Sequence, residues 1–163
     1  MRFATLMILG LWIAGALLCA AGCDREEATE VASVLKDAPI DPFRVILLET
    51  AFEAGSAMPI EPHIKNRSRV QESVVAALLE LDQPQRALRY IERIENWRRG
   101  AAYADLAFHC ARKDAKAAEV QAWLEEAIEI SEQAEDWRRD RIRSKVAKAR
   151  AYLGQTEVAA SLE

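Results

Sequence analysis

The chain has 163 residues, of which 51% are hydrophobic and 29% charged, and its formal net charge is −4. A modestly acidic chain has no general electrostatic attraction to a phosphate backbone, so the composition argues against a nucleic-acid partner. Even without its first 22 residues, the length suits one globular domain that buries about 70% of its extended-chain surface.

The first 22 residues are composed like an export signal. Arg2 is followed by residues 3–22, which carry no charge and are rich in leucine and isoleucine. A basic start, an apolar stretch and small residues at its exit are typical of a cleavable signal peptide. An uncleaved membrane-spanning helix is the alternative, because about 20 apolar residues can cross a bilayer. Either arrangement places the rest of the chain outside the cytoplasm.

The apolar stretch ends in Ala20-Ala21-Gly22, and Cys23 follows directly. This combination resembles the lipobox of bacterial lipoproteins, although Ala20 stands where that family usually has leucine. The resemblance implies that the signal is cut before Cys23 and that this cysteine is acylated, which would hold the protein on a lipid bilayer. Asp24 resembles the residue that retains such proteins in the inner membrane. The sequence therefore predicts a lipid-anchored protein of the bacterial cell envelope.

This interpretation divides the chain into three segments: a signal peptide over residues 1–22, acylated Cys23 with an acidic tether over 23–40, and a domain over 41–163. Cys19 leaves with the signal peptide and Cys23 carries lipid. Cys110 is then left without a partner for a disulfide within the chain. Its apolar neighbours predict that it is buried as a small hydrophobic residue.

The domain is predicted to be all-α. Residues 85–163 contain no proline and two glycines, and they are rich in alanine, leucine, glutamate and arginine, which favour helices. No run alternates between apolar and polar residues with a period of two, as a half-buried strand would. A further helix is expected over residues 42–55 on the N-terminal side.

An internal repeat divides the helical region. Glu95-Asn96-Trp97-Arg98-Arg99 recurs further along the chain as Glu135-Asp136-Trp137-Arg138-Arg139. Asn96 and Asp136 are predicted N-caps of two helices that reach turns at residues 113–114 and 153–154. An earlier, shorter unit aligns if Asp82 is matched to Asp114. The second helices of the three pairs are expected over residues 84–95, 115–134 and 155–163.

One face of each first helix is predicted to point into the core, because the spacing i, i+4, i+7, i+11 lies on one side of a helix. The predicted stripe comprises Val70, Val74, Ala77 and Leu81 in the first unit, Ala102, Leu106, His109 and Lys113 in the second, and Ile142, Val146, Ala149 and Leu153 in the third. The other face is wholly apolar in the second unit and mostly polar in the third. An interior repeat buries two faces and a terminal one buries one, so the second unit is expected to be sandwiched and the third to be a cap.

The segments LLELDQPQRALRYIE and RAYLGQTEVAASLE, at residues 78–92 and 150–163, resemble tetratricopeptide repeats in their turns and in the small residues of the second helix. The resemblance covers about residues 62–163. The unequal spacing, from Asp82 to Asp114 and then from Asp114 to Gly154, departs from the family's regular period of about 34 residues. The resemblance implies antiparallel helix-pair repeats stacked as a short solenoid, a class of fold that usually binds other proteins.

No catalytic or metal-binding constellation emerges from the sequence. Histidines occur only at His63 and His109, too few for a zinc site without accompanying cysteines, and His109 is expected to be a partly buried core residue. Glu72-Ser73 resembles the pair found in soluble lytic transglycosylases, but the glycine-containing and aromatic motifs that build their cleft are missing here. The sequence predicts no enzyme, no cofactor and no metal.

Arginine is the recurrent polar feature. Arg67, Arg99 and Arg139 hold equivalent positions near the start of each first helix, with Tyr103 and Arg143 one turn further on in the second and third units. These five residues are the candidate ligand-facing set, a basic strip for an acidic peptide or carboxylate. The alternative is that the arginines pair with Glu95, Glu135 and other nearby acids.

Together these features predict a membrane-anchored extracytoplasmic module or scaffold that binds another protein. The alternative is a structural or regulatory subunit, or an inhibitor, of a neighbouring membrane or envelope enzyme. A concave basic groove favours the first function and a flat apolar patch favours the second.

Overall fold

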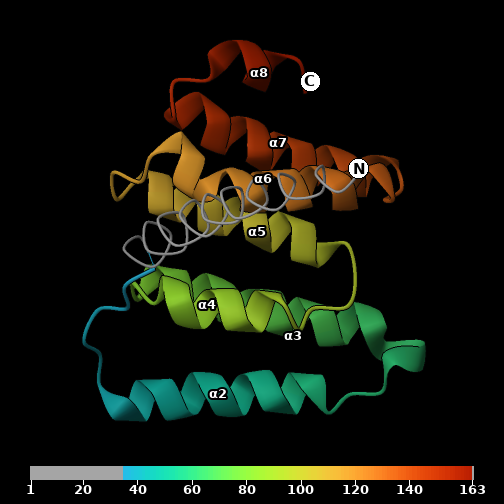
Figure 1. Ribbon diagram of the computed structural model, residues 1–163. Coiled ribbons are helices and arrows are strands. Elements are labelled where there is room, and N and C mark those ends of the chain that lie inside the picture. Colours follow the sequence, from blue (N-terminus) through green and yellow to red (C-terminus); the bar gives the residue numbers. More distant parts are fainter. Residues whose placement is uncertain (1–34, 163) are drawn as a thin grey trace, which may run out of the picture.

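The computed structural model describes residues 35–162, so the predicted signal peptide, Cys23 and the start of the tether lie outside it. Every regular element in the described part is a helix (Figure 1), which confirms the all-α prediction. The helices are α2 (Pro42–Ser56), α3 (Ile60–Glu80), α4 (Pro84–Ile91), α5 (Arg98–Ala111), α6 (Ala117–Glu132), α7 (Asp136–Tyr152) and α8 (Thr156–Ala160). No helix in this part is long and apolar enough to span a bilayer.

The helices are stacked in chain order, from α2 at one end to α8 at the other (Figure 1). α2 packs on α3, and α8 packs on α7. α5 lies in the middle, in contact with α3, α4, α6 and α7. Gly100 of α5 allows α6 and α7 to pack close to this helix. A Cβ atom at this position would lie 3.0 Å from Ile130 Cγ2 of α6 and 3.2 Å from Ile142 Cδ1 of α7.

Three helices end in the same kind of turn. Asp82, Asp114 and Gly154 follow the ends of α3, α5 and α7 with positive φ angles of 57°, 66° and 78°. In each turn the next residue's N–H donates to the carbonyl five residues back, as from Gln83 to Leu78 at 2.9 Å. This is the Schellman arrangement, which satisfies carbonyls that a helix end leaves free. The turns predicted at residues 113–114 and 153–154 are confirmed.

The helix starts agree less well with the prediction. Asn96 Oδ1 accepts a hydrogen bond from the N–H of Arg98 at 3.0 Å, as a capping side chain does. Asp136, in contrast, is the first residue of α7 and makes no cap bond, so its predicted role as N-cap is wrong. Its carboxylate instead accepts from Arg139 Nη2 at 2.8 Å, one turn along the same helix.

The second helices are shorter than expected. α4 ends at Ile91, where 95 was predicted, α6 spans Ala117–Glu132 within the predicted 115–134, and α8 ends at Ala160. At the end of α4 the N–H groups of Arg93 and Ile94 bond to carbonyls three residues back, so the chain tightens into turns.

The predicted core stripe is right for its three residues in α7 and rotated in α3, and Leu153, just past α7, is only partly buried. Ile142, Val146 and Ala149 are fully buried. In α3 the buried residues are Ser68, Gln71, Val74, Val75, Leu78 and Leu79, because this helix packs on α2 as well as on α4 and α5. In the second unit Ala102 and Leu106 are buried, His109 is half-buried and Lys113 is exposed.

The two faces of the first helices differ as expected between the middle and the end of the stack. In α5 the second face is also covered, with Ala101, Ala104 and Ala111 buried. In α7 the corresponding face is exposed at Arg141, Ser144 and Lys148. α5 is therefore sandwiched, whereas α7 turns a polar face away from the core.

Part of the predicted tether is packed against the domain. Leu35 is buried, and the carbonyl of Ala38 accepts a hydrogen bond from Gln83 Nε2 at 2.6 Å. Asp37 Oδ1 accepts from the N–H of Gln85 at 2.8 Å, which caps the start of α4. The packed domain thus includes residues 35–40, which the sequence had assigned to the tether.

α2 carries a second apolar face that no described residue covers. Phe52 and Gly55 are buried against α3, and Gly55 lies so close that a Cβ there would be 2.8 Å from Val70 Cγ1. Phe43, Ile46 and Leu47, on the opposite side of the helix, are 63%, 58% and 51% exposed. α2 is therefore built like a helix from the middle of a stack, although it lies at the end.

Candidate binding site

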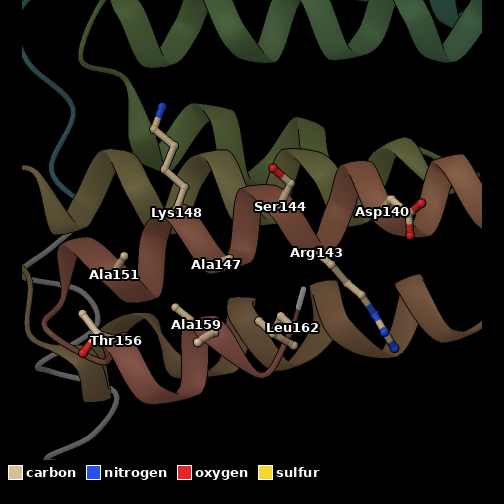
Figure 2. A pocket seen from close by; sticks show the side chains of 10 residues that line it. Asp140, Arg143, Ser144, Ala147, Lys148, Ala151, Thr156, Ala159 and Leu162 are labelled. Carbon is tan, nitrogen blue, oxygen red and sulfur yellow. The ribbon is translucent and has the colours of Figure 1, made fainter.

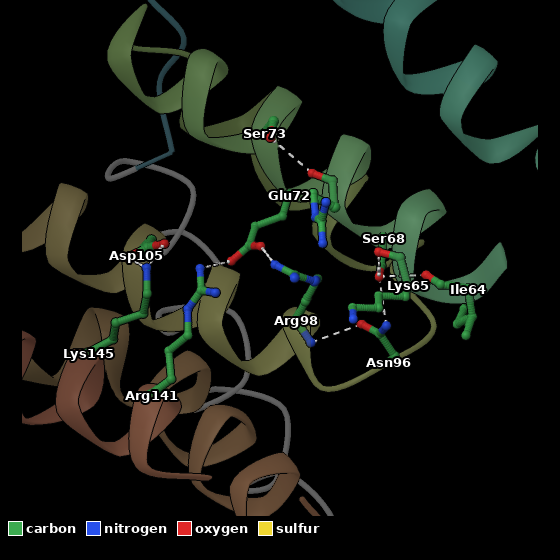
Figure 3. A network of polar contacts seen from close by, with 11 residues as sticks. Ile64, Lys65, Ser68, Glu72, Ser73, Asn96, Arg98, Asp105, Arg141 and Lys145 are labelled. Carbon is green, nitrogen blue, oxygen red and sulfur yellow. Dashed lines mark hydrogen bonds and ion pairs between the residues drawn. The ribbon is translucent and has the colours of Figure 1, made fainter. Parts of the chain in front are cut away.

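A cluster of charged side chains joins α3, α5 and α7 (Figure 3). Glu72 on α3 pairs through one carboxylate oxygen with Arg98 Nη1 of α5 and through the other with Arg141 Nη2 of α7, at 2.8 Å for the latter. The Glu72 and Arg98 side chains are 13% and 9% exposed. Both oxygens of the carboxylate are thus engaged, so Glu72 acts here as a tie between three helices.

Ser73, which follows Glu72 in the sequence, makes a separate contact. Its hydroxyl donates to the carbonyl of Arg69 at 3.0 Å within α3 (Figure 3). The Glu-Ser pair of the sequence therefore does not converge on one site. An ion pair that joins α5 directly to α7 lies beside the cluster, where Lys145 Nζ donates to Asp105 Oδ1 at 2.6 Å.

Two tryptophans from the internal repeat meet beside this cluster. The rings of Trp97 and Trp137 pack edge to face, with centroids 5.2 Å apart. The guanidinium groups of Arg98 and Arg141 lie 4.7 and 5.4 Å from the centre of the Trp97 ring, and that of Arg138 lies 5.4 Å from the Trp137 ring. Arginine over an aromatic face is held by the ring's quadrupole, so the cations and rings stabilise one another.

A pocket of about 180 Å³ opens next to the two tryptophans, and we refer to it as the Trp pocket. Its lining consists of Ile64, Lys65, Asn96, Trp97, Arg98, Trp137 and Arg138, with no carboxylate among them. The Asn96 amide donates to the Ser68 hydroxyl at 2.7 Å, which holds this side of the pocket against α3. Both copies of the repeated pentapeptide contribute to the lining. The reason is that α5 and α7 begin on the same side of the stack (Figure 1) and pack on each other.

The arginines that the sequence singled out lie in separate surroundings. Arg67 Nη1 donates to the carbonyls of Ser56 and Met58, the latter at 2.9 Å, and Nη2 lies 3.3 Å from Glu95. Its side chain is 15% exposed, so it fastens the α2–α3 connection. The alternative expectation of a pair with Glu95 is confirmed for this residue.

Arg99 and Arg139 also have acidic partners. Arg99 Nη2 lies 3.4 Å from Glu126 Oε1 on α6, and Arg139 Nη2 lies 2.8 Å from Asp136. Glu135, one of the acids expected to pair with these arginines, instead pairs with Arg138 at 3.4 Å. No two of the three predicted arginines share a carboxylate partner.

Tyr103 and Arg143 complete the predicted set. Tyr103 is only 9% exposed, and burial raises the pKa of its phenol. It belongs to the core of α5, so its predicted ligand-facing position is wrong: α5 buries both faces. Arg143 lies on α7 beside a hollow of about 620 Å³ between α7 and α8, together with Ser144, Lys148 and Leu162 (Figure 2).

The cations that converge on the Trp pocket are sequence neighbours of the arginines that were predicted. Lys65, Arg98 and Arg138 line the Trp pocket, whereas the sequence reasoning selected Arg99 and Arg139, the second arginine of each Trp-Arg-Arg. Successive residues on a helix point about 100° apart, so only one of two adjacent arginines faces the pocket. The repetition of the whole Trp-Arg pair was the signal that pointed to it.

At the opposite end of α5, Asp82 accepts from His109 Nε2 at 3.1 Å and from Lys113 Nζ at 2.9 Å. The hydrogen bond from Lys113 is the main cause that lowers the pKa of the Asp82 carboxyl. Cys110 lies beside them at 1% exposure, and burial raises the pKa of its thiol to about 12. Among the described residues, no group of histidine, cysteine, aspartate and glutamate is arranged to hold a metal ion.

The fold and the pocket define an all-helical protein with an aromatic, cationic pocket where three helices meet. Comparisons with known protein families, with curated proteins and with solved structures find no match to this chain.

Proposed function

We propose that this protein is a lipoprotein of the bacterial cell envelope whose helical domain binds another protein. Acylated Cys23 would anchor it to the bilayer, facing away from the cytoplasm, with the inner membrane favoured by Asp24. The support is the order of Arg2, the uncharged residues 3–22 and the lipobox-like exit. Mass measurement of the mature N-terminus tests the anchor: acyl chains on Cys23 are expected, and an uncleaved Met1 end would overturn it.

We further propose that α3–α4, α5–α6 and α7–α8 are three repeats of a short tetratricopeptide-like solenoid. The support is the shared geometry of the turns at Asp82, Asp114 and Gly154, which stand at equivalent positions of the three units found in the sequence. The sandwiched α5 and the polar outer face of α7 agree with an interior and a terminal repeat.

The observation that carries the binding function is the Trp pocket. Both copies of the repeated pentapeptide place a tryptophan and an arginine on it, and tryptophan and arginine are enriched where protein interfaces are strongest. Partly exposed rings beside cations suit a surface that a partner covers; Trp137 is 56% exposed.

A photocrosslinking side chain, benzoylphenylalanine, tests this function in cells that make the full chain. Placed at Ile64 on the pocket, where it removes no cation, it should give an adduct of one discrete mass after irradiation. Placed at Glu125, an exposed residue of α6, it serves as the control and should give none. An absence of adducts at Ile64 and at Ile46 on the outer face of α2 would overturn the binding function.

The apolar outer face of α2 favours the second candidate, a structural or regulatory subunit, or an inhibitor, of a neighbouring membrane or envelope enzyme. Phe43, Ile46 and Leu47 form an exposed apolar surface on the helix that directly follows the predicted tether. Such a surface is typical of a lasting interface. Crosslinking at Ile46 without crosslinking at Ile64 would support this candidate over the first.

A further inference from the structure

We propose that the Trp pocket receives the carboxylate of an aspartate or glutamate side chain within an extended acidic segment of the partner protein. This inference rests on the proposed protein-binding function and names the chemistry of its partner. The charge of the pocket, its free donors and its size support it.

The charges of the lining are all positive. Lys65, Arg98 and Arg138 contribute three cations, and the lining includes no acid. Lys65 forms no ion pair with any described residue, and Arg138 has only the mostly exposed Glu135 at 3.4 Å. Arg98 is paired with Glu72, so Lys65 and Arg138 are the cations whose charge is incompletely balanced when a carboxylate enters the pocket. Arg138 can bind that carboxylate through directional N–H groups.

Each of the two arginines of the pocket has an N–H group that donates no hydrogen bond to a described residue. The Nε–H groups of Arg98 and Arg138 are buried and have no acceptor among the described residues. The Arg98 side chain is 9% exposed and is held in place by Glu72. A buried donor without an acceptor is unfavourable, so a ligand oxygen gains a hydrogen bond where the partly exposed Arg138 side chain turns its Nε–H toward the pocket.

The size of the pocket favours one side chain of a larger partner over a free small molecule. Pockets that enclose a whole small-molecule ligand usually measure roughly 300–1,000 Å³. The Trp pocket measures about 180 Å³. The rings of Trp97 and Trp137 lie beside the cations and would cover the methylene groups of a glutamate or the backbone next to it.

Fluorescence anisotropy of a labelled peptide tests the inference on the full chain in detergent. The probe is a capped octapeptide of alternating glutamate and serine, and its counterpart replaces every glutamate with glutamine. The glutamate peptide should bind at least about tenfold more tightly than the glutamine peptide, as the loss of charge-assisted hydrogen bonds implies. Equal affinity for the two peptides, or no binding of the glutamate peptide, would overturn the inference.

A matched pair of variants separates the pocket from general charge attraction. Lys65→Gln with Arg138→Gln removes two pocket cations without touching the buried pair of Glu72 and Arg98. Arg44→Gln with Arg89→Gln removes two exposed cations on α2 and α4. The first pair should weaken glutamate-peptide binding by about tenfold and the second by less than about twofold. Equal weakening by both pairs would contradict the inference, and unchanged circular dichroism shows that each variant is folded.

Acetate is the competitor that separates a peptide site from a small-anion site. Displacement of the peptide by acetate at the peptide's own concentration would assign the pocket to small carboxylates and overturn the inference. Failure here is distinguishable from failure of the proposed function. Loss of peptide discrimination with crosslinks still formed at Ile64 rejects the acidic segment alone, whereas the absence of crosslinks at both Ile64 and Ile46 rejects protein binding.

Discussion

Trp97 and Trp137 are far apart in the chain, and their rings meet edge to face with centroids 5.2 Å apart. Each belongs to one copy of the repeated pentapeptide, and the arginine that follows each tryptophan lies over its ring. The repeat therefore places equivalent residues side by side, because α5 and α7 pack directly on each other. The same contact brings the cations of the Trp pocket together.

Replacing Arg98 with alanine is expected to destabilise the domain much more than replacing Arg141. Arg98 is the buried partner of Glu72, so its loss leaves a poorly solvated carboxylate and should lower the free energy of unfolding by about 3 kcal/mol. Arg141 is 40% exposed, and its loss should cost less than about 1 kcal/mol. Urea denaturation followed by circular dichroism measures both. Equal losses of unfolding free energy in the two variants would contradict the prediction that the Glu72–Arg98 pair contributes more to stability than the Glu72–Arg141 pair.

Protonation of Asp82 should lower the free energy of unfolding at acidic pH. Its pKa is lowered mainly by the hydrogen bond from Lys113, so its contribution is present above the unfolded-state pKa of about 4 and is lost as the pH falls through the lower folded-state value. Asp82→Asn removes this contribution and keeps a residue that tolerates the positive φ angle.

The measurement for Asp82 is the unfolding free energy of wild type and variant from pH 5 to pH 2. His109 and Lys113 both face Asp82, and both side chains are present in the wild type and in the variant. The difference between the two proteins should shrink with falling pH. Asp114→Asn, at the equivalent turn and exposed, is the control and should show no such trend. A constant difference for Asp82→Asn would refute the prediction.

The Cys110 thiol should be unreactive while the protein is folded. It is 1% exposed and its pKa is raised to about 12, so almost none of the reactive thiolate is present at pH 8. In a chain with Cys19 and Cys23 replaced by serine, iodoacetamide should modify Cys110 only when urea unfolds the protein. Mass spectrometry measures the fraction modified, and rapid modification without urea would show that the thiol is accessible.

Asp37 should stabilise the start of α4. Its carboxylate caps the N–H of Gln85, and Asp37→Ala should lower the free energy of unfolding by about 1 kcal/mol. Asp37→Asn should cost less, since asparagine also caps helices well. Urea denaturation compares the three proteins. If alanine and asparagine have the same effect, the stabilisation does not come from the cap.

Local sequence determined the helices and most of their turns. Asp114 and Gly154 mark helix ends because the residues before them favour helix and the turn requires a positive φ angle, which glycine adopts freely and aspartate tolerates. Cys110 was predictable as buried from its apolar neighbours, and it is buried. These properties depend on residues close in the chain, and each is confirmed.

The site depended on contacts between distant segments. Periodicity indicated that arginines recur near the starts of the first helices, but it did not distinguish Arg98 from Arg99, since that choice depends on how α5 is rotated between its neighbours. The acidic composition of residues 23–40 likewise assigned Asp37 to a tether. The contact by which Asp37 caps the N–H of the distant Gln85 leaves no local pattern in the sequence.

By itself, the sequence determined that this domain is helical and that a Trp-Arg unit is used twice. The packing of α5 against α3 and α7 decided which arginine of each unit faces the pocket and paired Glu72 with Arg98, and the packing of α5 among its neighbouring helices buried Tyr103. The physical reason is that helix formation is a local property, whereas the position of a side chain on a surface or in a core depends on which helix covers it.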